Sequence, residues 1–212
     1  LKGCTKNVTA LYFFTHSKPS IVLKSIRVFF LLNCVIICFM YSCKNKQGEN
    51  PLFTELPQSQ TGITFSNTLE KKERLNILYY LYYYNGGGVA TGDINNDGLA
   101  DIYFTANTKG HNKLYLNKGN FQFQDITENA GVRGISDWCS GVTMADVNND
   151  GLLDIYVSTV SNKYGLTGHN ELYINNGNAT FSEKSAQYGL NTSSFTTQSG
   201  FFDYDHDGDL DC

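Results

Sequence analysis

Three copies of one nine-residue acidic segment constrain what this chain can fold into more than any other feature of its sequence. The copies lie at residues 93–101, 146–154 and 203–211. Each has Asp or Asn at its first, third, fifth and ninth positions and Gly at its sixth. The glycine permits a sharp turn, so each copy is expected to form a loop. A loop that recurs in this way indicates a fold built from repeated units.

The sequence around these loops repeats as well. Residues 88–103 align without a gap on residues 141–156, at an offset of 53. Residues 110–119 align on residues 168–177, at an offset of 58. The extra five residues fall between positions 156 and 168, where a surface connection absorbs an insertion at little cost. We therefore expect two units of the same structure and a third copy that starts at Asp203.

Within each unit the apolar residues alternate with period two, which predicts strands rather than helices. Ile102 and Phe104 are expected on one face of a strand, and Tyr103 on the other. Asn and Gly residues at 117–120 and 175–178 tolerate the positive φ angles that tight hairpin turns require. About four short strands per unit follow, and because such a sheet cannot bury both faces alone, radial stacking of sheets is expected. The predicted fold class is all-β, a β-propeller.

The acidic loops are predicted calcium sites. Calcium takes six to eight oxygen ligands in flexible geometry, and side chains at loop positions 1, 3, 5 and 9 can converge on one ion with the carbonyl at position 7. Carboxylates this close together would repel one another without a cation. The three predicted ligand sets are Asp93, Asn95, Asp97, the Leu99 carbonyl and Asp101; Asp146, Asn148, Asp150, the Leu152 carbonyl and Asp154; and Asp203, Asp205, Asp207, the Asp209 carbonyl and Asp211.

Three other interpretations of these loops compete with calcium binding. An EF-hand requires a bidentate Glu at its twelfth position, and that position is Phe104 or Val157 here, inside a predicted strand. Magnesium prefers sites rich in water, which makes it a weaker candidate than calcium. The Asp and Asn side chains could instead form Asx-turns with their own backbone and hold no ion. This last alternative stays open on the sequence.

The N-terminal part of the chain predicts export. Lys24 and Arg27 precede an apolar run at residues 28–40, which has the length of a signal-peptide core and is shorter than the roughly 20 residues of a membrane-spanning helix. Residues 40–43, Met-Tyr-Ser-Cys, resemble a bacterial lipobox, in which the cysteine is lipidated and becomes the mature N-terminus. The predicted organisation is unassigned upstream sequence at 1–23, a signal peptide at 24–42, lipidated Cys43 with a tether at 43–57, and propeller repeats at 58–212.

The charge distribution argues against nucleic acid as a partner. Residues 43–212 carry 11 basic and 20 acidic side chains, whereas residues 1–42 carry five basic ones and no acid. An acidic body repels a phosphate backbone, and no stripe of Lys and Arg is interleaved with aromatic residues. The expected partners are a protein or glycan ligand and, through the lipid anchor, a membrane.

The repeated motifs resemble a known family. They are Tyr-Asn-Gly-Gly-Gly-Val-Ala at 84–90, the acidic loops, the Asn-x-Leu-Tyr-x-Asn segments at 112–117 and 170–175, and residues 201–211. Residues 58–212 resemble the FG-GAP/VCBS repeats of integrin α-subunit-like propellers, and more closely the ASPIC/UnbV, cartilage-acidic-protein-like group. The resemblance implies about seven four-stranded blades in the full protein, of which roughly two and a half are present, with calcium in the blade loops.

This pattern favours a binding or adhesion module over an enzyme. The sequence has no Gly-x-Ser-x-Gly elbow, Walker loop or His-Glu-x-x-His helix, which are signatures of common catalytic sites. The expected protein is an outer-membrane or cell-surface lipoprotein of a Gram-negative bacterium, or else a secreted protein, whose calcium ions are structural. The alternative is the propeller part of an extracytoplasmic hydrolase or lyase whose catalytic residues lie in blades beyond this sequence.

An aromatic cluster lies ahead of the first acidic loop. It consists of Tyr79, Tyr80, Tyr82, Tyr83 and Tyr84. These rings could line a carbohydrate-binding surface, because aromatic faces stack on sugars, but a strand with two packed faces is the favoured interpretation. Trp138, where the second unit begins, is expected to anchor packing.

Overall fold

The computed structural model describes residues 51–70 and 73–212 of the chain. The chain divides into two compact units, residues 1–54 and residues 55–212, and all the strands named below belong to the second. The predicted signal peptide at 24–42 and the predicted lipidation site at Cys43 lie outside the described residues. Within the described ranges, none of the helices has the length and apolar character needed to cross a bilayer.

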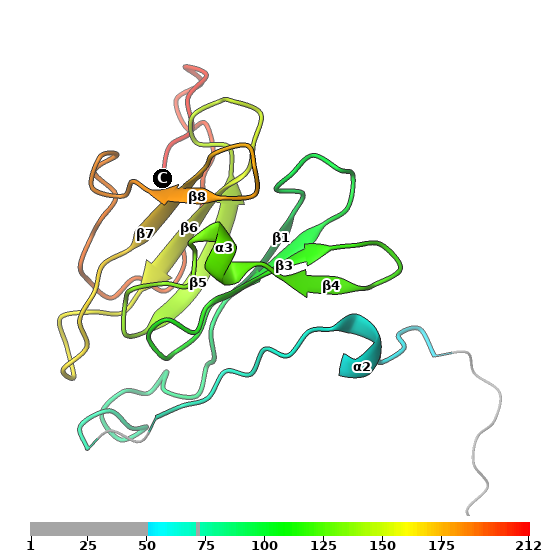
Figure 1. The fold of residues 1–212 in the computed structure, drawn as a ribbon. Coiled ribbons are helices and arrows are strands. Elements are labelled where there is room, and N and C mark those ends of the chain that lie inside the picture. Colours follow the sequence, from blue (N-terminus) through cyan, green and yellow to red (C-terminus); the bar gives the residue numbers. More distant parts are fainter. Residues whose placement is uncertain (1–50, 71–72) are drawn as a thin grey trace, which may run out of the picture. The chain divides into compact units, whose positions relative to one another are not determined.

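Residues 55–212 contain two antiparallel sheets of four strands each (Figure 1). In both sheets the strands follow one another in chain order, as in a meander. The first sheet contains β1 (Val89–Gly92), β2 (Asp101–Phe104), β3 (Lys113–Asn117) and β4 (Phe123–Asp125); the second contains β5 (Cys139–Ala145), β6 (Asp154–Thr159), β7 (Glu171–Asn175) and β8 (Phe181–Glu183). Two single-turn helices accompany them, α2 (Gln58–Thr61) and α3 (Thr127–Ala130). The predicted four strands per unit are confirmed.

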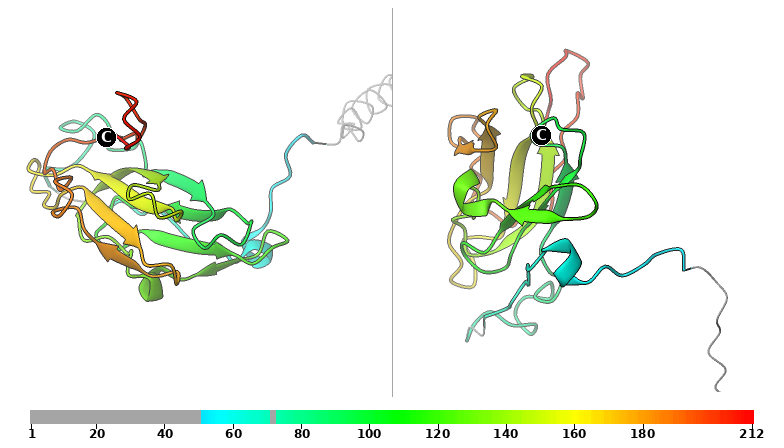
Figure 2. Two further views of the ribbon diagram at one scale, coloured as in Figure 1. Left: turned by 90° about the horizontal axis from the view of Figure 1, so that it is seen from above. Right: turned by 45° about the vertical axis from the view of Figure 1, so that its right-hand side comes forward.

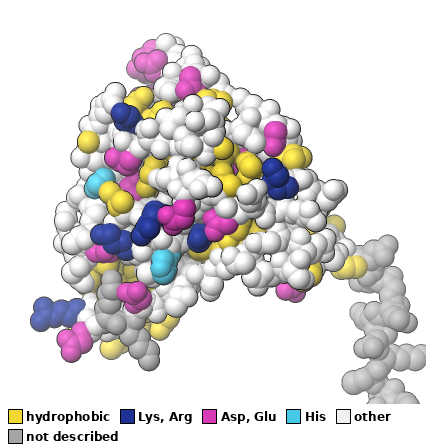
Figure 3. Space-filling view, viewed as in Figure 1, with side chains coloured by type: hydrophobic (Ala, Val, Ile, Leu, Met, Phe, Trp, Pro, Cys, Tyr) yellow, Lys and Arg dark blue, Asp and Glu magenta, His cyan; other side chains and the backbone are white. Residues whose placement is uncertain are grey.

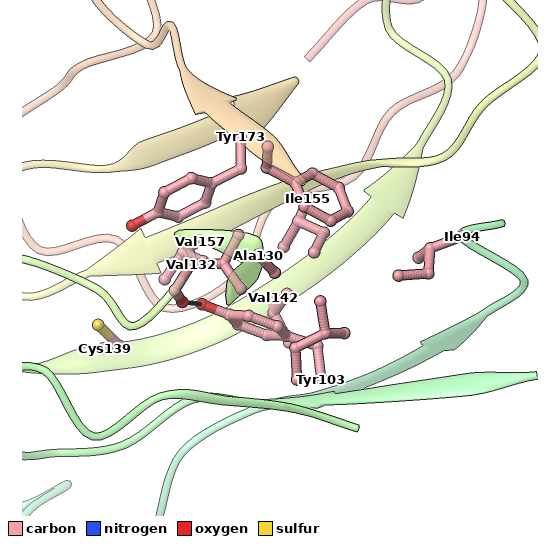
Figure 4. Packing of buried hydrophobic residues seen from close by; sticks show 11 residues of the cluster. Ile94, Tyr103, Ala130, Val132, Cys139, Val142, Ile155, Val157 and Tyr173 are labelled. Atoms are coloured by element: carbon pink, nitrogen blue, oxygen red, sulfur yellow. Dashed lines mark hydrogen bonds between the residues drawn. The ribbon is translucent and has the colours of Figure 1, made fainter. Parts of the chain in front are cut away.

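The two sheets are copies of each other in register as well as in order. Ile102 pairs with Tyr115 between β2 and β3, and the equivalent Ile155 pairs with Tyr173 between β6 and β7. The tyrosine that follows Ile in each second strand donates its hydroxyl to a backbone carbonyl beyond the fourth strand. Tyr103 reaches Val132 at 2.6 Å (Figure 4), and Tyr156 reaches Leu190 at 3.0 Å.

The two sheets face each other across one apolar core (Figure 4). β1 and β5 are neighbours, and a Cβ atom on Gly88 would lie only 2.8 Å from the Cα of Gly141, so the first strands of the two units approach closely. The core side chains come from both sheets and from the α3 connection: Ile94, Tyr103, Leu114, Ala130, Val132, Cys139, Val142, Ile155, Val157, Tyr173 and Phe181. Stacking of like sheets through their first strands makes these units β-propeller blades (Figure 2), which confirms the predicted fold class.

The second blade is covered on both faces, and its β6 strand is buried at every position. The first blade lies on one side. On the other side the backbone of residues 194–199 follows β5 and β6: Thr196 N–H donates to the Thr159 carbonyl, and Gln198 Nε2 donates to the Val142 carbonyl. Because β6 is covered on both faces, even its polar residues Asp154, Ser158 and Thr159 are buried, and the side chain of each makes a hydrogen bond.

The prediction of a strand at Tyr79–Tyr84 is wrong. These residues form consecutive turns, in which the Tyr80 N–H donates to the Asn76 carbonyl and the Tyr83 N–H to the Tyr80 carbonyl. Tyr80 and Tyr83 are buried against Trp138. The inward residues are thus three apart, and a two-residue strand period could not place both rings on one side. Trp138 is only 3% exposed, so its predicted packing role is confirmed.

Glu171 begins β7 and is completely buried. Its carboxylate accepts hydrogen bonds from the backbone N–H groups of Ile135 and Ser136, at 3.0 and 2.8 Å, and from the Tyr173 hydroxyl. It therefore fastens the connection between the blades to the second blade. The equivalent residue of the first blade is Lys113, which pairs with Asp125 at 2.8 Å on a partly exposed surface.

This difference predicts unequal effects of two substitutions at one repeat position. Glu171→Ala should lower the free energy of unfolding by about 3 kcal/mol, because buried N–H donors lose their acceptor. Lys113→Ala should cost no more than about 1 kcal/mol, because it removes a partly exposed ion pair. Urea denaturation of the full-length variants measures both. Equal midpoints for the two variants would contradict the assigned role of Glu171.

Candidate metal centre

The three acidic segments form loops, and the first two join the first and second strands of their blades. The loop at 93–101 connects β1 to β2, and the loop at 146–154 connects β5 to β6. Their fourth and sixth residues have positive φ, 57° at Asn96 and 84° at Gly98 in the first loop. Asn and Gly are the residues that adopt this conformation at least cost. Residues 203–211 form the third loop, closed by backbone bonds between Phe202 and Asp211.

In the first loop the side chains of positions 1, 3 and 5 hold the backbone in its turn. The Asp93 carboxylate accepts the N–H groups of Asp97 and Gly98, at 3.1 and 2.7 Å. Asn95 Oδ1 accepts the Asp97 N–H at 3.2 Å, and Asp97 Oδ1 accepts the Leu99 N–H at 2.9 Å. These are bonds of the Asx-turn type. The loop is therefore shaped by its own carboxylates.

The second loop repeats this framework bond for bond. Asp146 accepts the N–H groups of Asp150 and Gly151, at 3.0 and 2.8 Å. Asn148 Oδ1 accepts the Asp150 N–H at 3.1 Å, and Asp150 Oδ1 accepts the Leu152 N–H at 2.9 Å. Three carboxylate and amide side chains, at positions 1, 3 and 5, thus perform the same local task in each of the two blades. Agreement of this kind indicates one structural unit used twice.

The ninth residue of each of the first two loops is a buried aspartate at the start of the second strand. Asp101 is 0% and Asp154 is 1% exposed. Asp101 accepts the Ile94 N–H at 3.0 Å and the Asn117 N–H at 2.7 Å, so it ties the loop to β3. Burial raises the pKa of Asp101, and the nearby charges of Asp97 and Asp93 add to this, although the two N–H groups act in the opposite direction. A cation would relieve the repulsion.

The first residue of the loop titrates in the opposite direction. Desolvation opposes the effect, but the backbone N–H groups that point at Asp93, led by those of Gly98 and Asp97, lower its pKa. Asp93 is thus held as a carboxylate, which is the state that a metal ligand requires. The loop thus combines two kinds of carboxylate. Backbone N–H groups stabilise the negative charge of Asp93, whereas burial disfavours the negative charge of Asp101.

The third loop brings three of its carboxylates close together. Oxygen atoms of Asp203, Asp205 and Asp211 lie within 4.8 Å of one another, the one such group of metal-binding side chains among the described residues. Asp203 Oδ1 is buried and has no hydrogen-bond partner within the described ranges. Acidic side chains gather in Figure 3 at the upper end of the molecule, where the red third loop of Figure 1 lies. The donor atoms are all hard oxygens, which suit calcium.

The predicted site residues are thus located as follows. Positions 1, 3, 5 and 9 lie around each turn, and in the third loop the carboxylates at positions 1, 3 and 9 form one close group. The position-7 residues Leu99, Leu152 and Asp209 follow the glycine in each loop. The twelfth positions, Phe104 and Val157, lie in β2 and β6, which excludes an EF-hand. The hydrogen bonds of the Asx-turn alternative are present, and they leave each carboxylate with unused lone pairs for an ion.

Neighbouring loops are also bonded to each other. Asn96 Nδ2 donates to the Gly151 carbonyl at 3.1 Å. Asn175, at the end of β7, donates from Nδ2 to the carbonyls of Ile94 and Leu153, at 2.8 and 3.1 Å, while its own N–H donates to Asp154. One asparagine of the second blade therefore supports the loops of both blades.

The asparagines that end the third strands are site residues that sequence reasoning missed. Asn117 and Asn175 each donate their N–H to the buried aspartate of their blade, at 2.7 and 2.8 Å. Each also accepts the N–H of the glycine two residues later. The signal that could have identified them is the repeated Asn at the end of each Leu-Tyr-x-Asn segment.

These blades and loops define a class of protein, the repeat-built β-propeller with acidic loops between its first and second strands. FG-GAP-like repeats match residues 93–157 and 160–212. Because these matches span more than half of the sequence, the chain belongs to the FG-GAP-like repeat family.

Curated relatives narrow the family to one group. Over 73 residues the chain is 42% identical to cartilage acidic protein 1 of Xenopus tropicalis, 41% identical to that of Mus musculus and 40% identical to that of Homo sapiens. These matches cover 34% of this chain and 11% of each relative. The chain thus spans about a tenth of the length of the curated relatives it matches. The similarity confirms the predicted FG-GAP/ASPIC group.

The double support by Asn175 generates a prediction with a matched control. Asn175→Asp places a carboxylate oxygen against two carbonyls, whereas Asn117→Asp faces one carbonyl, that of Ala100 at 2.9 Å. Asn175→Asp should therefore be the more destabilising substitution, by about 1–3 kcal/mol. Thermal melting of the two variants in one buffer provides the comparison. If Asn117→Asp melted at the lower temperature, the inter-blade role of Asn175 would be refuted.

Proposed function

We propose that the chain is part of an exported, membrane-anchored β-propeller that binds calcium in its acidic loops and acts as a protein- or carbohydrate-binding module. The observation that carries the calcium proposal is the set of three loops with the same residue pattern, two of which share one hydrogen-bond framework. The calcium ions are structural: each would join the start of a blade's second strand to the loop before it. The propeller then presents its variable surfaces to a ligand.

Calcium is the cation that the donor set favours. At its five ligand positions each loop offers carboxylate or amide side-chain oxygens and a backbone carbonyl, and no imidazole or thiolate. This donor set argues against zinc and other transition metals. The ligands would be the residues at positions 1, 3, 5, 7 and 9, with Asp93, Asp97 and Asp101 supplying the charge in the first loop. A bound ion would offset the mutual repulsion of these carboxylates. Flexible coordination tolerates the asparagine at position 3 in two loops and the aspartate Asp205 in the third.

The binding role is supported by the family and by the composition of the surface. FG-GAP-like repeats indicate a propeller module of the adhesion type. The face seen in Figure 3 carries charged side chains of both signs among polar ones, and these groups can make selective polar contacts with a ligand. Export and lipidation rest on the sequence of residues 24–43, so they are argued from the apolar run and the lipobox alone.

Calcium binding predicts a metal-dependent melting temperature. The full-length protein should melt several degrees higher in millimolar calcium than in chelator, because an ion that binds only the native state adds about 2.7 kcal/mol at a hundredfold excess over its dissociation constant. Asp97→Asn should reduce the shift, since it removes one ligand charge. Glu128→Gln, at an exposed side chain outside the loops, should leave the shift unchanged. Identical melting curves in calcium and in chelator would refute calcium binding.

Lipidation predicts a change in membrane association. Replacement of Cys43 by Ser should move the protein from the membrane fraction to the soluble fraction, because two acyl chains or a comparable anchor are needed for stable attachment. Cys139→Ser, at a buried free thiol, is the control and should leave the distribution unchanged. Fractionation of cells that express each full-length variant tests this. Membrane retention of the Cys43→Ser protein would contradict the anchor.

A further inference from the structure

A pocket of about 420 Å³ opens beside the aromatic segment, and it is lined by Arg74, Tyr79, Tyr164 and Gly165. It belongs to the other end of the second blade from the acidic loop. Trp138 precedes β5 and Val160 follows β6, whereas the loop at 146–154 joins the opposite ends of these strands. The pocket is therefore separate from the candidate metal centre. Its volume lies within the range of about 300–1,000 Å³ that is typical of small-molecule sites.

The walls of the pocket are fixed by buried neighbours. The Tyr164 hydroxyl donates to the Tyr79 carbonyl at 2.8 Å, which joins the two sides. The ring of Tyr80 is buried and contacts those of Tyr164, Trp138 and Phe195, with centroids 5.7 to 5.8 Å apart. Tyr79 itself is 62% exposed. Buried Tyr80 thus fixes the segment, and Tyr79, the residue before it, is exposed. Because the segment is already fixed, little conformational entropy would be lost when a ligand binds to Tyr79.

The lining of the pocket contains one cationic side chain and no acidic one. Arg74 contributes a guanidinium group to its lining, and Lys163 lies next to Tyr164 in the chain, with its Nζ 4.9 Å from the centroid of the Phe195 ring. The two ion pairs found among the described residues are Lys113 with Asp125 and Arg133 with Glu128. Neither involves Arg74, so within the described ranges no ion pair competes with an anionic ligand for its guanidinium group.

We propose that this pocket binds an acidic saccharide, a chain of hexuronic acid units. The inference rests on the proposed binding function and names its ligand class. A sugar ring offers a face of C–H groups that packs on the rings of Tyr79 and Tyr164, because aromatic faces carry partial negative charge. A uronic acid adds a carboxylate, which the Arg74 guanidinium can bind through two parallel hydrogen bonds. A neutral sugar leaves Arg74 unpaired, and a small inorganic anion leaves the rings uncovered.

The test compares two probes on the full-length protein in calcium-containing buffer. Isothermal titration with an oligogalacturonate trimer should detect binding, and a neutral maltotriose of the same length should bind at least tenfold more weakly. Raising the salt concentration should weaken binding of the acidic trimer, because an exposed ion pair is screened. Equal affinity for the two trimers, or no binding of the acidic one, would overturn the proposal.

Matched variants assign the binding to the pocket. Arg74→Gln and Tyr79→Ala should each weaken binding of the acidic trimer at least tenfold. Lys118→Gln removes an exposed cation from the hairpin between β3 and β4, and Tyr188→Ala removes an exposed ring after β8; both should bind as the unchanged protein does. Loss of binding in the control variants, or its retention in the pocket variants, would place the saccharide elsewhere and reject the pocket.

The outcome can be separated from that of the calcium proposal. Melting temperatures are recorded for every variant in calcium and in chelator before titration. A protein with a normal calcium shift and no affinity for the acidic trimer rejects the saccharide site alone. A protein that binds the trimer with the expected preference but melts identically in calcium and chelator supports the pocket and rejects the metal sites.

Discussion

The repeat depends on a buried aspartate that accepts hydrogen bonds from two directions. Asp101 receives one backbone N–H from the loop before it and one from β3, and Asp154 does the same in the second blade. Both carboxylates are shielded from water, where an ionised group is costly unless it is well paired. These hydrogen bonds join the loop, the second strand and the third strand, which explains why an aspartate occupies this position in both blades. The repulsion from the neighbouring carboxylates is the reason why we propose a bound cation.

Stacking supplies what one blade cannot supply alone. Each four-stranded sheet is too small to bury its apolar side chains, so blades cover each other. The two units approach so closely that a Cβ on Gly88 would collide with the backbone of Gly141 and Val142. The second blade, covered on both faces, has an entirely buried β6, whereas β1 of the first blade alternates between exposed and half-buried residues. Whether a residue of a strand is buried in this fold thus depends on the neighbouring blades as much as on the sequence of the strand.

The sequence was sufficient to predict the blades and the loops because their signals are local. Strands follow from the period-two pattern around Tyr103, the turns follow from glycines such as Gly98, and the repeat multiplies both signals. Tyr80 and Tyr83 were misassigned to a strand because their burial depends on Trp138, more than 50 residues away in the chain. Glu171 was not identified for the same reason: it aligns with Lys113, and only the fold places it among buried N–H groups.

Residues that recur in every blade and residues that occur once have different uses. The loop aspartates and the asparagines after the third strands recur, and a group needed by each blade's own geometry must recur. Ligand selectivity has the opposite requirement, because one site on the assembled surface needs a group that other blades lack. Arg74 and Tyr79 precede the first blade and have no repeat counterpart. Selectivity is therefore to be sought at the aromatic end of the blades, while the acidic end maintains the fold on which that surface is built.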